Sequence, residues 1–228
     1  MQTECAPQVH PTIPAIQMLL RKIDSLRLPT RSRRDVESIL VRQVVRELDR
    51  VLPSYAGHGL RTAEIAMRLG QELAMTDEEL HQLKLASYLH DIGLLTLPPA
   101  VNEAGTFLDC ETYRTIQNHV RLGASLLEPF TFLRTASVLI AHHHERWDGS
   151  GYPYGIRGSF IPLGARILSI ADAFDSIRVP DASDRTLRDQ IALRVLRVSA
   201  GTQFDPWLVD LFCARHARSF VSTGFQQS

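Results

Sequence analysis

Apolar residues recur every three or four positions along most of the chain, which is the spacing of one buried helix face. One such series begins at Asp35 and carries Val36, Ile39 and Leu40, and a second begins at His58. The pattern and its breaks predict helices over residues 35–52, 58–73, 77–91, 109–127, 133–144, 162–174, 186–199 and 205–216. No run of alternating apolar and polar residues indicates a strand ladder. The sequence therefore predicts an all-α fold built as a helical bundle.

Residues with strong local preferences mark the expected helix ends. Pro53 ends the first series, because proline cannot continue a helix. Thr76 followed by Glu79 is the signature of a capping box, and Asp109 can cap another helix start. Clusters of glycine, proline and asparagine predict two loops. These loops fall at residues 98–105 and 149–164.

The pattern divides the chain into one large domain and two short flanks. Residues 33–220 form the expected helical domain, which is an ordinary size for one domain. Residues 1–32 contain four prolines and predict a tail or a short helix with a basic connector, and residues 221–228 predict a tail. Six basic residues against one aspartate occupy positions 21–34. We interpret this stretch as a solvated connector, with a contact for an acidic partner as the alternative.

Composition excludes several classes of function. The formal net charge is zero, so bulk charge holds the chain neither on DNA nor on an anionic membrane. No apolar run is long enough for a membrane span, and the N-terminus lacks the pattern of a signal peptide. Cys5, Cys110 and Cys213 are far apart and form no CxxC pair. We therefore expect neither a disulfide framework nor a cysteine zinc site, and a cytoplasmic protein.

Histidines and two aspartates form the candidate chemistry. Of nine histidines, His10, His81 and His216 lie in ordinary surface-like contexts and receive no role. The others sit at helix ends or on apolar helices, and Asp91 and Asp172 follow or interrupt apolar runs. A buried carboxylate is costly unless it is paired or bound to a cation. Imidazole and carboxylate together suit iron, manganese or zinc, and the absence of nearby thiolates disfavours a structural zinc site.

The His90-Asp91 doublet needs a helix end, because neighbours on a helix point ~100° apart. Gly93 supplies such an end. A natural arrangement gives His90 to one metal and lets Asp91 bridge to a second, so that both are candidate catalytic residues. Two metals ~3.5–4 Å apart would hold a bridging hydroxide for phosphoester hydrolysis. The doublet alone is weak evidence, since the dipeptide is common by chance.

The ordered set of motifs is far more specific than the doublet. After His58 come HDIG at residues 90–93, His119 in NHVRLGASLL, HHERWDGSGYP at residues 143–153, and ARILSIADAFD. Here the sequence resembles the HD-GYP family, the branch of the HD phosphohydrolases that hydrolyses cyclic di-GMP. The resemblance is strong over residues 50–178 and weaker through residues 201–212. It implies a helical bundle of the HD-domain phosphohydrolase type.

The resemblance also implies a set of metal ligands. Asp91 would bridge two metals, iron or manganese in the first place, with zinc, nickel and magnesium as alternatives. The first metal would be held by His58, His90 and Asp172, and the second by His119, His143 and His144. His142 is then a bystander. Members of the family that bind three metals carry a Glu four residues before the first histidine, and this chain has Ser54 at that position. We therefore expect two metals and the linear dinucleotide pGpG as the main product, with further cleavage to GMP as the alternative.

Several positions depart from the family pattern around the substrate. The family motif continues HDIGK, with a lysine placed to meet phosphate, but this chain has Leu94. The following loop, which the family usually makes basic, contains Glu103, and only Arg178 and Arg185 could replace a nucleotide-binding Arg-Pro-Tyr segment. These departures leave two alternatives open: a metal-bound module that acts by binding a nucleotide or a protein, and hydrolysis of another phosphoester.

The GYP loop has two interpretations. Its glycines and proline could shape a tight lid. In the family the loop is also involved in substrate access and in contacts with diguanylate cyclase (GGDEF) domains, and Tyr152 could serve either purpose. Glu145 and Asp148 would orient the metal ligands from outside the coordination sphere. The sequence leaves a homodimer open.

Overall fold

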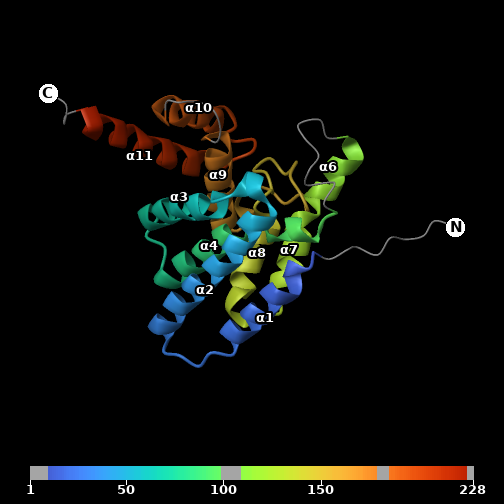
Figure 1. Ribbon diagram of the computed structural model, residues 1–228. Helices are drawn as coiled ribbons and strands as arrows, with labels where there is room; N and C mark the ends of the chain where they lie inside the picture. Colours follow the sequence, from blue (N-terminus) through green and yellow to red (C-terminus); the bar gives the residue numbers. More distant parts are fainter. Residues whose placement is uncertain (1–9, 99–108, 179–184, 225–228) are drawn as a thin grey trace.

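A computed structural model describes residues 10–98, 109–178 and 185–224 of the chain, and their regular structure is helical (Figure 1). The only bridge between these residues is an isolated pair, Ala200 and Phe204. The all-α prediction is confirmed. The longer helices are α1 (Thr12–Asp24), α2 (Thr30–Val51), α3 (His58–Glu72), α4 (Asp77–Leu89), α6 (Cys110–Gln117), α7 (His119–Leu127), α8 (Arg134–His142), α9 (Leu163–Arg178), α10 (Arg185–Val198) and α11 (Pro206–Gly224). The 3₁₀ turns are η1 (Pro53–Tyr55), η2 (Ile92–Thr96), η3 (Thr131–Leu133) and η4 (Gly158–Phe160).

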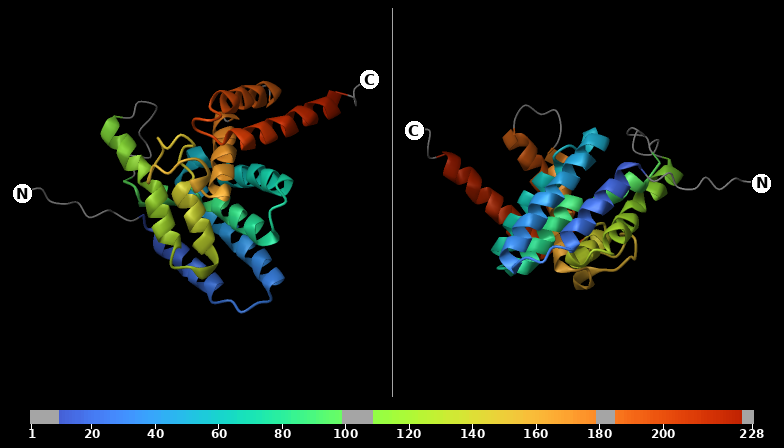
Figure 2. Two further views of the ribbon diagram at one scale, coloured as in Figure 1. Left: turned by 180° about the vertical axis from the view of Figure 1, so that it is seen from behind. Right: turned by 60° about the horizontal axis from the view of Figure 1, so that its bottom comes forward.

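Helix α4 lies at the centre of the bundle. It packs against α2, α3, α8 and α9 (Figure 2). Its first turn is acidic and exposed, but from His81 to Leu89 every residue except Lys84 is buried, and Leu83, Leu85 and Leu89 are fully buried. A helical segment that is covered on all sides lies in the interior of a bundle. The end of α4 therefore delivers the next two residues, His90 and Asp91, into the middle of the molecule.

The N-terminal flank contains a helix that belongs to the core. Helix α1 buries Ile13, Ile16, Leu20 and Ile23 and packs against α2. Of the two alternatives for residues 1–32, the structure therefore has the helix. Helix α2 begins at Thr30, earlier than the apolar pattern indicates, because its arginine-rich start consists largely of good helix formers that show no apolar periodicity. At the other end α11 continues to Gly224, past the start of the expected tail at residue 221.

The basic stretch of residues 21–34 finds acidic partners within the chain. The Nε of Arg33 lies 2.7 Å from Oε1 of Glu37, one helical turn along α2. The Nη2 of Arg34 lies 2.7 Å from Oε2 of Glu78, in the acidic first turn of α4. Arg34 therefore braces α2 against α4, while Arg33 pairs within α2. The partly exposed pair of Arg34 and Glu78 contributes about 1 kcal/mol or less.

Capping residues correctly predicted two helix starts, whereas the sequence pattern did not predict where two of the helices end. The capping box of Thr76 and Glu79 is present, and Asp109 accepts a hydrogen bond from the backbone N–H of Thr112. The single helix expected over residues 109–127 is wrong, because α6 ends at Gln117 and α7 begins at His119. The expected helix over residues 133–144 also ends early, at His142.

Two further expectations concern cysteines and membranes. Cys110 is an exposed free thiol and Cys213 a buried one, while Cys5 lies outside the described residues. None of the described helices combines the length and the apolar composition that a membrane crossing needs.

Gly93 allows η2 to touch α7. A Cβ built on Gly93 would lie 1.9 Å from the backbone oxygen of His119 and 2.7 Å from the backbone nitrogen of Gly123. Both are backbone atoms, which cannot rotate away. Only glycine therefore permits the contact that sets the distance between Asp91 and His119.

Replacing Gly93 by alanine should push α7 away from η2. We expect a loss of unfolding free energy of about 1–3 kcal/mol, the range for overpacking, together with weaker metal binding. Thermal denaturation and metal analysis would measure both. Gly201→Ala, where φ is +80° and no atom lies within 4 Å of the new Cβ, shows the cost of backbone strain without a steric clash. A Gly93→Ala protein as stable as wild type would contradict the steric explanation.

Candidate metal centre

Seven side chains from five parts of the chain meet at the centre of the bundle. His58 and His119 are the first residues of α3 and α7, His90 and Asp91 follow α4, His143 and His144 follow α8, and Asp172 lies within α9. Their ligand atoms form three overlapping groups, in each of which all atoms lie within 4.8 Å of one another. The groups are His58, His90 and Asp172; His90, Asp91 and His143; and His119, His143 and His144. The structure thus brings together all seven residues that the sequence singled out, and metal binding by them stays a prediction.

The first group lies between α3, α4 and α9. Nε2 of His58 lies 3.0 Å from Oδ1 of Asp172 and 3.2 Å from Nε2 of His90. Nε2 of His90 lies 3.8 Å from the same oxygen of Asp172. Three ligand atoms therefore surround one point, as a single metal ion requires.

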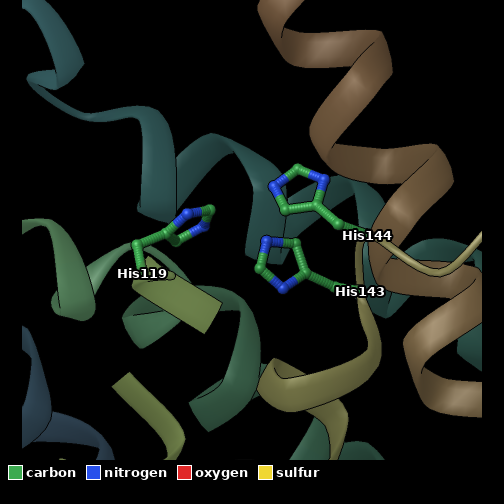
Figure 3. Close-up of side chains that lie close together, drawn as sticks. All are labelled: His119, His143 and His144. Carbon is green, nitrogen blue, oxygen red and sulfur yellow. The ribbon is translucent and has the colours of Figure 1, made fainter. Parts of the chain in front are cut away.

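The group of His119, His143 and His144, which we call the second group, consists of imidazoles alone. Figure 3 shows the rings of His143 and His144, from the end of α8, facing that of His119. Asp91 lies between the two groups. Its Oδ2 is 3.2 Å from Nε2 of His90, while its Oδ1 is 3.6 Å from Nε2 of His119. One oxygen towards each group is the arrangement that a bridging carboxylate needs.

Backbone carbonyl groups orient three of the rings. The Nδ1 atoms of His90, His119 and His143 lie 2.9, 2.8 and 2.7 Å from carbonyl oxygens three residues earlier. A carbonyl oxygen can only accept, so each Nδ1 donates and leaves the lone pair on Nε2. The Nε2 atoms of His119 and His143 are buried without a hydrogen-bond partner. Buried acceptor atoms of this kind fit a divalent cation.

The charge state of the protein groups also suits a cation. Burial favours the neutral acid at Asp91 and Asp172, but His90 beside the first and His58 beside the second outweigh it and lower the pKa of both carboxyls. Burial opposes protonation of His58, yet its hydrogen bonds to Asp172 and Asp175 raise the pKa to about 10. A metal ion would take the place of this proton on Nε2.

The pKa values of His143 and His144 shift downwards, in the opposite direction to that of His58. Burial lowers the pKa of both rings, and the surrounding imidazoles lower that of His143 further. For His144 the pKa falls to about 4. Both rings are therefore neutral at pH 7, with lone pairs available for a metal.

Asp175 and Arg61 are site residues that the sequence reasoning missed. Oδ2 of Asp175 lies 2.8 Å from Nδ1 of His58, and Nε of Arg61 donates to Oδ1 of Asp175 at 2.9 Å. Asp175 is 1% exposed. The spacing was a usable signal, because Asp175 is three residues after Asp172 and therefore on the same face of α9.

The residues of the GYP loop serve different purposes. Tyr152 stacks on His144 with ring centroids 5.0 Å apart, which places it at the edge of the second group. Glu145 is buried and accepts from the backbone N–H of Tyr154, while Asp148 accepts from the backbone N–H and hydroxyl of Ser150. These bonds of Glu145 and Asp148 shape the loop rather than hold a ligand ring.

The other residues considered in the sequence analysis are not part of the metal-ligand groups. His142 takes part in none of the metal groups, and its Nδ1 lies 2.8 Å from the carbonyl oxygen of Val138. Ser54 is exposed in η1, and Leu94 is only 3% exposed in the hydrophobic core. Arg178 and Arg185 end α9 and begin α10 respectively, but their side chains lie outside the described residues, as does all of Glu103.

The profile of the HD domain family matches residues 42–208, which is most of the chain. The chain belongs to the HD domain family. A 3'3'-cGAMP-specific phosphodiesterase of Vibrio cholerae is 32% identical over 167 residues, covering 72% of this chain and 32% of the relative. A cyclic di-GMP phosphodiesterase response regulator of Xanthomonas campestris is 33% identical over 152 residues, covering 66% of this chain and 40% of the relative. The HD domain chain thus spans well under half the length of these relatives.

Solved structures show the same fold. An HDG"Y"P protein from Bdellovibrio bacteriovorus superposes with a TM-score of 0.60 at 17% identity, covering 90% of this chain and 70% of that one. A cyclic GMP-AMP-specific phosphodiesterase of V. cholerae gives a TM-score of 0.54 at 24% identity, covering 71% and 44% of the two chains. Together with the HHERWDGSGYP motif, the relatives place this HD domain in the HD-GYP branch.

Acid should destabilise the metal-free HD domain through its buried rings. His144 has a pKa of about 4 when folded and about 6.5 when unfolded. Below pH 6.5 the imidazole of His144 therefore binds a proton in the unfolded chain but not in the folded one. The free energy of unfolding then decreases as the pH falls towards 4. Thermal denaturation in a chelator should show a decline of Tm between pH 6.5 and 4.5. We expect His144→Ala to flatten this decline and His142→Ala to leave it unchanged; equal slopes in both variants would contradict the assignment.

Proposed function

We propose that this HD domain is a metal-dependent phosphodiesterase that opens a cyclic dinucleotide to its linear form at a two-metal centre. The observation that carries the proposal is the position of Asp91, which directs one oxygen towards His90 and the other towards His119. Three nitrogen or oxygen ligands stand ready on each side. Carboxylate-bridged pairs of metal ions are a recurring design for phosphoester hydrolysis.

The metals and several residues of the centre have defined roles in this proposal. Bound divalent ions would supply an activated water molecule and neutralise charge on the phosphate. Asp91 holds the spacing between the two positions, and His90 anchors the first. Tyr152, stacked on His144, offers an aromatic face at the edge of the site for a nucleobase. We propose iron or manganese as the native metal, since both accept mixed imidazole and carboxylate ligands.

The substrate class follows from the relatives and from the site. Relatives are named for action on cyclic di-GMP or on 3'3'-cGAMP, which share a ring closed by two phosphodiester bonds. We propose cyclic di-GMP as the first candidate. Ser54 gives a hydroxyl where a carboxylate would be needed for a third metal, and it is exposed. A two-metal centre would favour one cleavage, so we expect linear pGpG as the main product.

A metal-bound module with weak turnover is the second candidate. It is favoured by Leu94, an apolar residue buried at 3% exposure where a phosphate-binding lysine would stand. Such a module would bind a nucleotide or a protein partner without efficient hydrolysis. For the partner we propose a diguanylate cyclase domain that contacts the GYP loop, where Tyr154 is 57% exposed and Phe160, further along the loop, 82%.

Asp91→Ala should remove both the second metal and the activity. Protein purified without oxygen should hold close to two metal ions per chain, and the variant fewer. We expect cleavage of cyclic di-GMP to fall at least about 100-fold, the scale for losing one key electrostatic stabiliser. His142→Ala, from the same histidine run but outside the cluster, should keep its metal and its activity. Cleavage that persists in Asp91→Ala would contradict the mechanism, and GMP as the first product would contradict the product assignment.

Leu94→Lys tests whether the absence of a lysine at this position limits turnover. A cation near the phosphates should raise kcat/KM about 10-fold, which corresponds to roughly 1.4 kcal/mol. Burying the ammonium should also lower thermal stability. Leu94→Met, of similar volume and without charge, should change neither quantity much. A folded Leu94→Lys protein with unchanged turnover would show that this position does not limit the rate.

A further inference from the structure

Four of the five histidines in the cluster are held in two different ways. His90, His119 and His143 donate from Nδ1 to neutral carbonyl oxygens of their own helix ends. His58 instead meets a carboxylate, since its Nδ1 lies 2.8 Å from Oδ2 of Asp175. An anionic acceptor makes an imidazole a stronger metal ligand than a neutral carbonyl does.

Asp175 is itself fixed from both sides. Arg61 Nε lies 2.9 Å from one of its oxygens and 3.0 Å from the other. Nη1 of Arg61 donates to the carbonyl oxygen of Ala56 at 3.1 Å, just before α3. Because Arg61 is three residues after His58, the guanidinium and the ring share one face of α3. The carboxylate therefore has one orientation, and so has the ring of His58.

The two metal positions also differ in formal charge. The position of His58 and His90 includes the carboxylate of Asp172 and one oxygen of Asp91, while the charge of Asp175 behind His58 is balanced by Arg61. The group of His119, His143 and His144 contains no carboxylate of its own, and Asp91 directs its other oxygen towards His119. A divalent cation is attracted more strongly where more negative charge lies nearby.

We propose that Asp175, clamped by Arg61, is a positioning residue that makes the His58, His90 and Asp172 position the tighter of two unequal metal positions. The metal at that position loads first and leaves last. The inference rests on the proposed function, because it presupposes that the cluster binds two divalent ions. It adds an order of loading and names the two residues that set it.

Titration of metal-free protein with Mn²⁺ tests the order. Free Mn²⁺ can be counted by its EPR signal, without any assay of activity. Wild type should show one tight and one weaker binding step. Asp175→Asn keeps the size of the side chain but removes its charge. It should weaken the tight step about 10–100-fold, the usual effect of losing such an outer partner, and leave the weak step within about threefold.

Arg61 provides a second variant should Asp175→Asn fold poorly. Arg61→Gln removes the clamp while leaving the carboxylate in place, and we expect it to weaken the same tight step by a smaller factor. Arg61→Lys retains a cation beside Asp175 and should recover most of the lost affinity. A role in folding alone would not produce this selective loss and recovery of one binding step.

The chain contains a matched control away from the cluster. Glu37 is 3% exposed, with one oxygen 2.8 Å from Nε2 of His81 and the other 2.7 Å from Nε of Arg33. Glu37→Gln thus breaks another buried histidine–carboxylate–arginine set. It should lower Tm as Asp175→Asn does but leave both Mn²⁺ steps unchanged.

The results of the titration distinguish a failure of the proposed metal centre from a failure of the proposed order of loading. Wild type that binds no Mn²⁺ would overturn the proposed metal centre and this inference with it. Wild type with two steps, and an Asp175→Asn protein with the same two steps, would overturn the inference alone. Weakening of the second step instead of the first would overturn it as well.

Discussion

The burial of two ionised carboxylates is the constraint on which this structure depends. Asp91 and Asp172 expose only 18% and 17% of their side chains, and an isolated charge that is so largely removed from water is strongly unfavourable. Their surroundings resolve the problem with imidazole groups, since His58 and His90 lie beside them. Helices from five parts of the chain must converge to supply these groups. The arrangement of the bundle around α4 serves this convergence.

Helix ends make the convergence possible. Adjacent side chains on a regular helix diverge, so neighbours such as His90 and Asp91 can share a target only where the helix stops. The break at Asn118, between α6 and α7, likewise places His119 at a helix end, as the first residue of α7. The backbone contact at Gly93 then fixes how far α7 lies from η2. Small features of the backbone thus set the distances between ligands.

The C-terminal part of the domain stabilises the GYP loop. The backbone N–H groups of Trp147 and Asp148 donate to the carbonyl oxygens of Gln203 and Thr202, at 3.1 and 2.9 Å. Arg166 adds a side-chain link, because it pairs with Asp205 at 2.5 Å and lies 5.7 Å from the ring centroid of Trp147. The turn before α11 is thereby connected to the loop that follows His143 and His144. The weaker resemblance over residues 201–212 therefore covers a segment with a structural task at the site.

The chain thus supports four of the five rings in the cluster in two ways. Backbone carbonyls hold three of them and cannot be altered by substitution of a side chain. A carboxylate and a guanidinium hold the fourth, His58, at a site that substitution can change. The second kind of support is open to tuning of metal affinity, and the first is not.

The sequence by itself determined the helices and the residues brought together at the centre. Periodicity and caps such as Thr76 are local, and the ordered histidine motifs are read without any contact map. Tertiary structure alone decided the partnership of His58 with Asp175, which are 117 residues apart. It also decided that α1 joins the core and that Leu94 is buried. Such contacts depend on how helices pack across long separations in the chain, and spacing along a sequence carries no information about which distant faces will meet.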